Sequence, residues 1–265
     1  MRRNRLVRFV IIIVLAAVIF FLVQSLGKYL IGEISSYNEP LDPNQVSVEV
    51  IEKTILRLEP MEYYTCHVGA ISDLTLAQGE IDLFAQKGYR VYAVGESPYH
   101  LYLGCWGQDV DLTALPDEFQ QIGADVYIAK NTLNNVSLKF KDSEQIYSEH
   151  IAPLIASIDV LIKQSLKMFE TPQYDQYAQE NWQSMITALN EELEQIDTQI
   201  AVILMDEEEI IAQEMLKLSD ALQGYQQGLE IISQSQNDKS LYLAQSYLLA
   251  LIDCYHRAIT NLSAQ

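Results

Sequence analysis

The segment from Tyr63 to Ala129 contains one pattern twice, and this repeat constrains the fold more than any other feature of the chain. The first copy covers residues 63–94 and the second covers residues 99–129. Each copy reads as a strand, a glycine turn, a helix, a second glycine and a second strand. Two such units in succession predict a ferredoxin-like βαββαβ domain over residues 61–131. The glycines that divide the copies are Gly69, Gly88, Gly104 and Gly123.

The two copies begin with similar strand sequences, Tyr63-Tyr64-Thr65-Cys66-His67-Val68-Gly69 and Tyr99-His100-Leu101-Tyr102-Leu103-Gly104-Cys105-Trp106. In these motifs and in their order, residues 61–131 resemble the SPOR (sporulation-related repeat) domain of bacterial cell-envelope proteins. The resemblance implies a domain that binds peptidoglycan through one sheet face, on glycan strands stripped of their stem peptides. The chain departs from the family pattern at His67, where the family usually has Gln, and at Tyr102, where it often has Arg.

Alternation along the predicted strands assigns side chains to the two sheet faces. Leu101 and Leu103 are aliphatic and are expected to face the helices, so their neighbours face outward. Tyrosines on an outward face suit sugar binding, because rings stack on the C–H side of a pyranose while hydroxyl and imidazole groups bond its hydroxyls. Two alternatives remain: tyrosines are also good strand formers, and the helices could bury this face. The predicted glycan-binding residues are Tyr63, Thr65, His67, Tyr92, His100, Tyr102 and Tyr127.

The chain has three cysteines, Cys66, Cys105 and Cys254, so at least one of them is unpaired within it. None has the close spacing of a zinc site, and we expect no metal and no cofactor. The favoured interpretation is three small buried hydrophobic residues. By strand alternation, Cys66 and Cys105 are both expected on the helix side of the sheet, and a disulfide between them is the alternative.

The N-terminus carries a membrane signal. Residues 9–26 are almost wholly apolar and approach the ~20 residues that span a bilayer as a helix. Arginines precede this run and an acidic chain follows it, so the positive-inside rule places the N-terminus in the cytoplasm and the body outside. We predict a single-pass protein of the cell membrane, with residues 1–30 as basic stub and anchor and residues 31–60 as a linker. A signal peptide cleaved near Lys28 is the alternative.

Within the linker, the apolar spacing from Val46 to Leu58 fits a strand and a helix about equally well. Residues 142–265 then contain four apolar stripes at helical spacing. No such helix can bury its stripe alone, so the four are expected to pack as an antiparallel bundle. The boundary between the second and third helices near Met205 stays open, because no glycine or proline marks it. The stripes begin at Ile151, Trp182, Ile211 and Leu241.

The charge of the chain excludes some partners. The net charge of the chain is −19. The first 30 residues hold five basic residues and no acid, so the remaining residues together carry a net charge of −24. Such an acidic body disfavours nucleic acid, whose phosphates require a basic surface. The sequence has no P-loop, no G-x-S-x-G, no H-E-x-x-H and no dinucleotide-binding fingerprint, so catalysis is not expected.

These observations predict an α+β protein with an N-terminal transmembrane helix, a SPOR-like βαββαβ domain and a C-terminal antiparallel helical bundle. The expected function is non-catalytic binding of peptidoglycan glycan strands at the cell wall, in cell division or sporulation. Residues 9–26 would make the membrane a second partner. The alternative is an envelope scaffold protein that binds a protein partner through its helical bundle.

Overall fold

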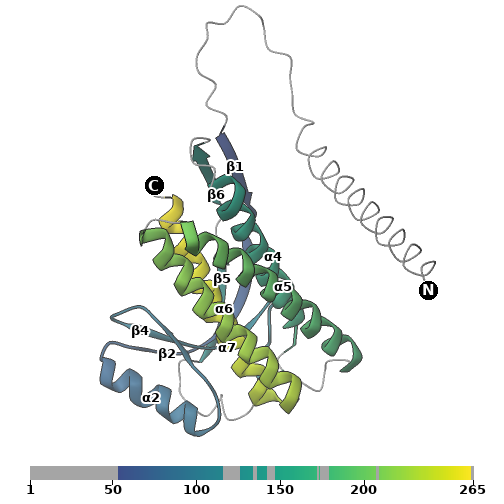
Figure 1. Ribbon diagram of the computed structural model, residues 1–265. Coiled ribbons are helices and arrows are strands. Elements are labelled where there is room, and N and C mark those ends of the chain that lie inside the picture. Colours follow the sequence, from purple (N-terminus) through teal and green to yellow (C-terminus); the bar gives the residue numbers. More distant parts are fainter. Residues whose placement is uncertain are drawn as a thin grey trace, which may run out of the picture. The chain divides into compact units, whose positions relative to one another are not determined.

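The computed structural model describes residues 53–115, 126–133, 136–141, 147–171, 173, 179–206 and 209–263. They belong to one compact unit, Ile51–Gln265. This described part is α+β, with two antiparallel sheets and five α-helices (Figure 1). None of its helices combines the length and the apolar composition needed to cross a membrane. The predicted anchor, residues 9–26, and residues 31–52 of the predicted linker lie outside the described residues.

The larger sheet has the strand order that the repeat predicts. Across the sheet the order is β3-β4-β2-β5, and each neighbouring pair is antiparallel. In a βαββαβ chain the two strands joined by a helix lie on either side of a third strand, as β2 and β3 do here. The second helix of the repeat would fall mainly on residues 116–125, outside the described residues. The strands are β2 (Met61–Ile71), β3 (Tyr92–Val94), β4 (Tyr99–Trp106) and β5 (Tyr127–Leu133).

Helix α2 (Leu74–Gln86) covers one face of this sheet, and local signals set both of its ends. Asp73 caps the helix by accepting a 2.9 Å hydrogen bond from the backbone amide of Leu76. Gly88 follows the C-terminal end at φ +87°, a conformation that favours glycine. Phe84 is buried in a cluster with the aliphatic residues of β4, on the face where the strand alternation places them.

The smaller sheet is a two-stranded ribbon that no pattern in the sequence predicts. β1 (Lys53–Leu58) pairs in antiparallel register with β6 (Val136–Lys141), although the two strands lie far apart in the chain. The open choice between strand and helix for the end of the linker is therefore decided for residues 53–58, which form a strand.

Four helices follow, and each buries the apolar stripe that predicted it. Near Met205 the second and third helices are separate, because α5 and α6 pack against each other, as two halves of one straight rod could not. A turn at Gln236 and Asn237 joins α6 to α7, so these two helices run antiparallel. The helices are α4 (Ala152–Met168), α5 (Gln179–Asp206), α6 (Glu209–Ser235) and α7 (Asp238–Ser263), and a π-helical turn at Tyr147–Ile151 leads into α4.

Helix α7 packs against both the bundle and the four-stranded sheet (Figure 1). The main hydrophobic core joins residues of all four helices to Met61, Cys105 and Leu133 of the sheet. Tyr242 of α7 lies in the second core, which also contains Phe84 of α2. The helix is therefore buried around most of its circumference, whereas the apolar spacing of its sequence predicts a single buried stripe. The sheet and the helices thus share one core.

A β-bulge in β4 reverses the predicted direction of one cysteine. Thr65 pairs with Cys105 and Cys66 pairs with Leu103, so Gly104 is an extra residue in β4, at φ +73°. The extra residue shifts the alternation by one position. Cys105 consequently packs in the main core, while Cys66 stays on the α2 side. The prediction that both face α2 is wrong for Cys105, and all three cysteines are free.

Candidate functional site

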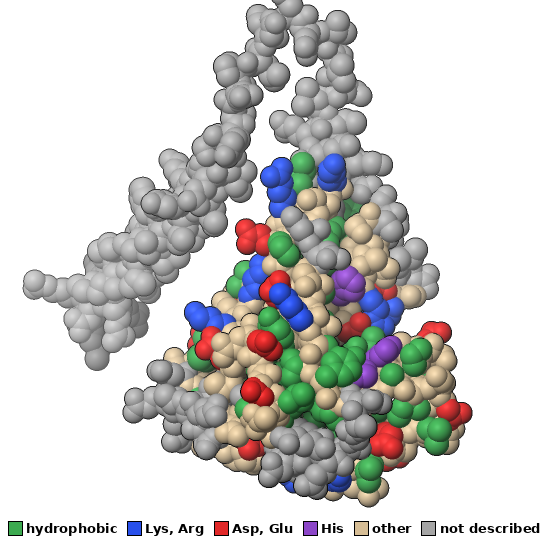
Figure 2. Space-filling model, turned by 180° about the vertical axis from the view of Figure 1, so that it is seen from behind, with side chains coloured by type: hydrophobic (Ala, Val, Ile, Leu, Met, Phe, Trp, Pro, Cys, Tyr) green, Lys and Arg blue, Asp and Glu red, His purple; other side chains and the backbone are tan. Residues whose placement is uncertain are grey.

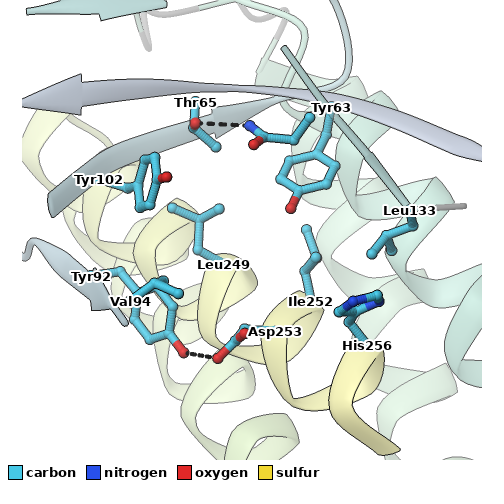
Figure 3. Close-up of a pocket in the computed structure, with 11 residues that line it drawn as sticks. Tyr63, Thr65, Tyr92, Val94, Tyr102, Leu133, Leu249, Ile252, Asp253 and His256 are labelled. Carbon is cyan, nitrogen blue, oxygen red and sulfur yellow. Dashed lines mark hydrogen bonds between the residues drawn. The ribbon is translucent and has the colours of Figure 1, made fainter. Parts of the chain in front are cut away.

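The outward face of the four-stranded sheet and helix α7 enclose a hollow, here called the tyrosine groove (Figure 3). Tyr63, Tyr92 and Tyr102 point from the strands toward side chains of α7. The volume of the groove is about 170 Å³, below the roughly 300–1,000 Å³ of sites that enclose a whole small molecule. The groove therefore suits one ring of an extended ligand. It is lined by Tyr63, Thr65, Tyr92, Val94, Tyr102, Asn131 and Leu133 of the sheet and by Leu249, Ile252, Asp253 and His256 of α7.

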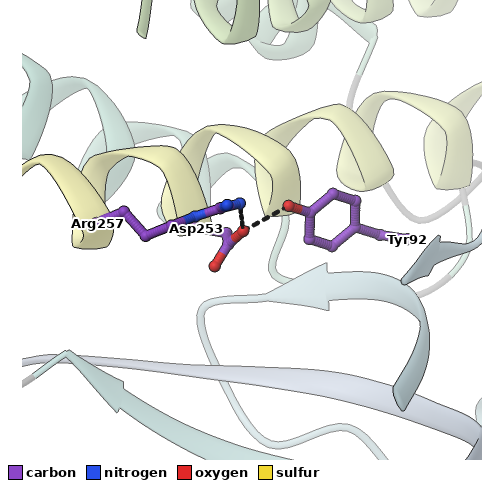
Figure 4. A network of polar contacts seen from close by, with 3 residues as sticks. All are labelled: Tyr92, Asp253 and Arg257. Atoms are coloured by element: carbon purple, nitrogen blue, oxygen red, sulfur yellow. Dashed lines mark hydrogen bonds and ion pairs between the residues drawn. The ribbon is translucent and has the colours of Figure 1, made fainter. Parts of the chain in front are cut away.

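Polar contacts hold two sides of the tyrosine groove. Tyr92 Oη donates a 2.7 Å hydrogen bond to Asp253 Oδ2 (Figure 4). Arg257, one helical turn further along α7, forms an ion pair with the same oxygen. On the other side, Asn131 Nδ2 donates a 3.0 Å hydrogen bond to Thr65 Oγ1. Carboxylate, amide and hydroxyl groups are thus fixed in a hollow whose remaining walls are apolar and aromatic.

Burial raises the pKa of each tyrosine in the groove. Desolvation is the main cause for Tyr63 and Tyr92, and the hydrogen bond from Tyr92 to Asp253 raises the pKa of Tyr92 further. Desolvation also raises the pKa of Tyr102, with a smaller contribution from nearby Tyr127. The three phenols therefore stay protonated at neutral pH and act as hydrogen-bond donors.

Beside the groove, four rings gather on the same sheet face and form what we call the ring cluster: His67, His100, Tyr102 and Tyr127. The His67 ring lies at the centre, with its centroid 4.6 Å from that of Tyr127, 5.4 Å from that of Tyr102 and 5.5 Å from that of His100. Nε2 of His67 and Nδ1 of His100 are 3.3 Å apart, so one imidazole donates to the other. His67 is 4% exposed and Tyr127 is 48% exposed. Tyr127 is therefore a ring of the cluster that a ligand can reach from solvent.

The side chains predicted to face outward do lie together on one sheet face. Tyr63, Thr65, Tyr92 and Tyr102 line the tyrosine groove, and the remaining three join Tyr102 in the ring cluster. The face is not open across its whole width, because α7 covers the part that holds Thr65, which is 2% exposed. One alternative was that the helices bury the outward sheet face. This is the case for the part of the face that lines the groove, whereas Tyr127 remains accessible.

The α7 half of the site, which contributes Asp253 and His256, is not predicted by the strand alternation. A signal for it was available in the apolar residues Tyr242 and Leu249, which fall beside the recognised stripe. A helix that is apolar on more than one side needs more than one partner to bury it. The second partner of α7 is the sheet.

Among the described residues, the lining of the groove combines one acidic side chain with aromatic and apolar groups. Asp253 is the one acidic side chain among the described residues that line it. Glycoside hydrolysis usually needs two carboxyl groups, roughly 5 to 9.5 Å apart. In the described part of the chain, no group of three or more His, Cys, Asp and Glu residues is placed to hold a metal ion. The site offers rings for stacking and polar groups for hydrogen bonds.

Comparison of the chain with protein-family models, with curated proteins and with solved structures gives no match. The resemblance to SPOR domains therefore stays a prediction from the strand motifs of the sequence. The fold and the site define an α+β protein whose sheet carries a groove and a ring cluster on one face.

Proposed function

We propose that this protein is a non-catalytic, membrane-anchored protein of the cell envelope that binds peptidoglycan glycan strands, in cell division or sporulation. The binding surface is the sheet face formed by the ring cluster and the tyrosine groove. The observation that carries the proposal is the gathering of tyrosine and histidine rings on this face, with Tyr127 48% exposed. The SPOR-like motifs and the predicted anchor at residues 9–26 support the assignment to the envelope.

A glycan strand suits this surface in chemistry and in extent. Tyr127 and Tyr102 offer ring faces on which the apolar side of a pyranose can stack. Asp253, His256 and Asn131 supply acceptors and donors for sugar hydroxyls in the adjoining groove. Because Tyr102 belongs to both the cluster and the groove, successive rings of one strand can contact both.

The test is a pull-down of residues 51–265, the compact unit, on purified sacculi, with and without an amidase that removes stem peptides. Tyr127→Ala removes an accessible ring from the cluster. Tyr99→Ala is the matched control, because Tyr99 shares the strand parity of Leu101 and lies on the α2 side. One good contact of this kind is worth ~1–3 kcal/mol, so Tyr127→Ala should weaken binding roughly 5- to 150-fold. Equal affinities of the two variants, with unchanged circular dichroism, would contradict the proposal.

A second candidate is an envelope scaffold protein that acts through its helices. This candidate is favoured because α7 covers part of the sheet face. Tyr92 on that part is hydrogen-bonded to α7 within the chain. In this case sacculi would not retain the protein, and binding of a protein partner would survive Tyr127→Ala. Such binding should instead be lost in Leu216→Asp, which places a charge on an exposed apolar position of α6.

A further inference from the structure

The ribbon of β1 and β6 concentrates positive charge in a chain that is otherwise strongly acidic. Its strands, KTILRL and VSLKFK, contain four basic residues and no acid, whereas the chain as a whole carries −19. Elsewhere the protein neutralises many of its cations internally. Lys130, Lys163, Lys217 and Arg257 are each in an ion pair with a carboxylate.

Strand pairing brings charges of the ribbon to one face. Ile55 pairs with Lys139 and Arg57 pairs with Ser137, so these four residues share a face, and all four are exposed. The alternate positions, including Leu58 and Leu138, pack in the main core. Lys53 and Lys141 are paired with each other further along the same register. We call β1 and β6 together the basic ribbon.

A hollow lies against the exposed residues of the basic ribbon, at the end of β1 where Leu58 and Glu59 lie. The hollow has a volume of about 670 Å³ and is lined by Ile55, Arg57, Leu58, Glu59, Ser137 and Lys139. Neither Arg57 nor Lys139 forms an ion pair among the described residues, and Glu59 is the one acid of the lining. Figure 2 shows Lys and Arg side chains at the upper end of the coloured part of the molecule, where the ribbon lies. A guanidinium fork and an ammonium beside an open hollow suit a phosphate group.

We propose that the basic ribbon docks on the anionic phospholipid headgroups of the membrane that carries the protein. Charge complementarity is the first argument for this occupant. The second is the position of the ribbon in the chain, since only residues 27–52 separate Lys53 from the predicted anchor. A chain of that length spans at most about 90 Å, so the ribbon is held within that distance of the bilayer.

This docking fixes which part of the body faces the membrane. The acidic remainder of the chain is repelled by an anionic surface, and the ribbon is attracted to it. Both effects act over about 8 Å at physiological salt, so the local charge of the contacting surface decides the orientation. The inference rests on the predicted anchor and does not depend on glycan binding.

The test is flotation of residues 51–265, the compact unit, with vesicles of phosphatidylglycerol and phosphatidylcholine in equal parts, and with vesicles of phosphatidylcholine alone. We expect binding to the anionic vesicles only, weakening as salt is raised. A basic residue near an anionic surface is worth roughly fivefold in partitioning. Arg57→Gln combined with Lys139→Gln keeps two long side chains and should lower binding about 25-fold.

Lys87→Gln combined with Lys167→Gln is the matched control, because it removes the same charge outside the ribbon. It should change partitioning by less than about twofold. Equal losses in the two double variants would overturn the proposal, since net charge and not the ribbon would then be recognised. Equal binding to neutral vesicles would overturn it as well. Sacculus binding by the ribbon variant is expected to be unchanged, which separates this docking from the proposed glycan binding.

Discussion

Tyr92 of β3 donates a 2.7 Å hydrogen bond to Asp253 of α7, across 161 positions of sequence. This bond ties the edge strand of the sheet to the last helix of the bundle (Figure 4). Tyr92→Phe keeps the ring and removes only the hydroxyl. A hydrogen bond to a charged group contributes about 1.5–3 kcal/mol, and Asp253 keeps its ion pair with Arg257, so we expect a loss near the lower limit. Urea denaturation of residues 51–265 measures it.

A double-mutant cycle isolates this bond from other effects of the two substitutions. Tyr92→Phe and Asp253→Ala should be non-additive, with a coupling energy of at least about 0.5 kcal/mol. Strict additivity would mean that the two side chains do not interact in solution.

Gly228 sets the distance between α6 and α7. A Cβ at this position would lie 2.9 Å from the Cα of Ala244, which is backbone and cannot rotate away. Gly228→Ala should therefore destabilise the protein by about 1–3 kcal/mol, although alanine is the better helix former. Gly79 of α2 is the control, since a Cβ there meets nothing within 4 Å. Gly79→Ala should stabilise the protein by about 0.5–1 kcal/mol. Shifts of the thermal midpoint in the same direction would contradict this account of the packing.

Local sequence patterns predict most elements of this fold because each pattern lies within a contiguous segment. Alternating residues gave β2, β4 and β5, and heptad-like spacing gave the four helices. The pairing of β1 with β6 had no such signal, because it joins segments separated by the whole four-stranded sheet domain. Its stability depends on the main core beneath it, which includes Leu58 and Leu138.

The candidate site likewise has one half that local sequence patterns predict and one half that they do not. Alternation placed the sheet half of the site on one face, because that face is a property of each strand. The α7 half depends on how the helix docks, which no local pattern encodes. The predicted direction of the Cys105 side chain was wrong for a related reason, because alternation does not reveal a β-bulge. Gly104 is the extra residue of the bulge, and the ring of Trp106 packs where a Cβ of residue 104 would lie, so this position requires glycine.

Gln245 of α7 is fully buried, and neither atom of its amide group has a hydrogen-bond partner among the described residues. A buried amide without partners costs about 1–3 kcal/mol. Gln245→Met keeps the unbranched shape and removes the polar group, so it should raise the free energy of unfolding by about 1 kcal/mol. Gln227→Met, at an exposed position of α6, should change it by less than about 0.5 kcal/mol. A clear loss of stability in Gln245→Met would show that the amide group is bonded in solution.

Alkaline pH should destabilise this protein through its buried thiols and phenols. Burial raises the pKa of Cys66 to about 12 from an ordinary value of 9.0, and it raises the pKa of Cys105 as well. Burial likewise raises the pKa of Tyr225 and Tyr255 from an ordinary value of 10.0. Above pH 9 these groups ionise first in the unfolded chain. The folded state then holds more protons, so the free energy of unfolding falls as pH rises.

The expected pH profile follows from these two ordinary pKa values. The urea midpoint should be level from about pH 7 to 8.5 and should fall above about pH 9, with a steeper fall above about pH 10 as the tyrosines contribute. Between its pKa in the unfolded chain and its pKa in the folded protein, each buried group lowers the free energy of unfolding by about 1.4 kcal/mol per pH unit. Cys66→Ala combined with Cys105→Ala removes two of these groups and should flatten the decline between pH 9 and 10. An unchanged slope in that variant would mean that the two thiols are not protected from ionisation by burial.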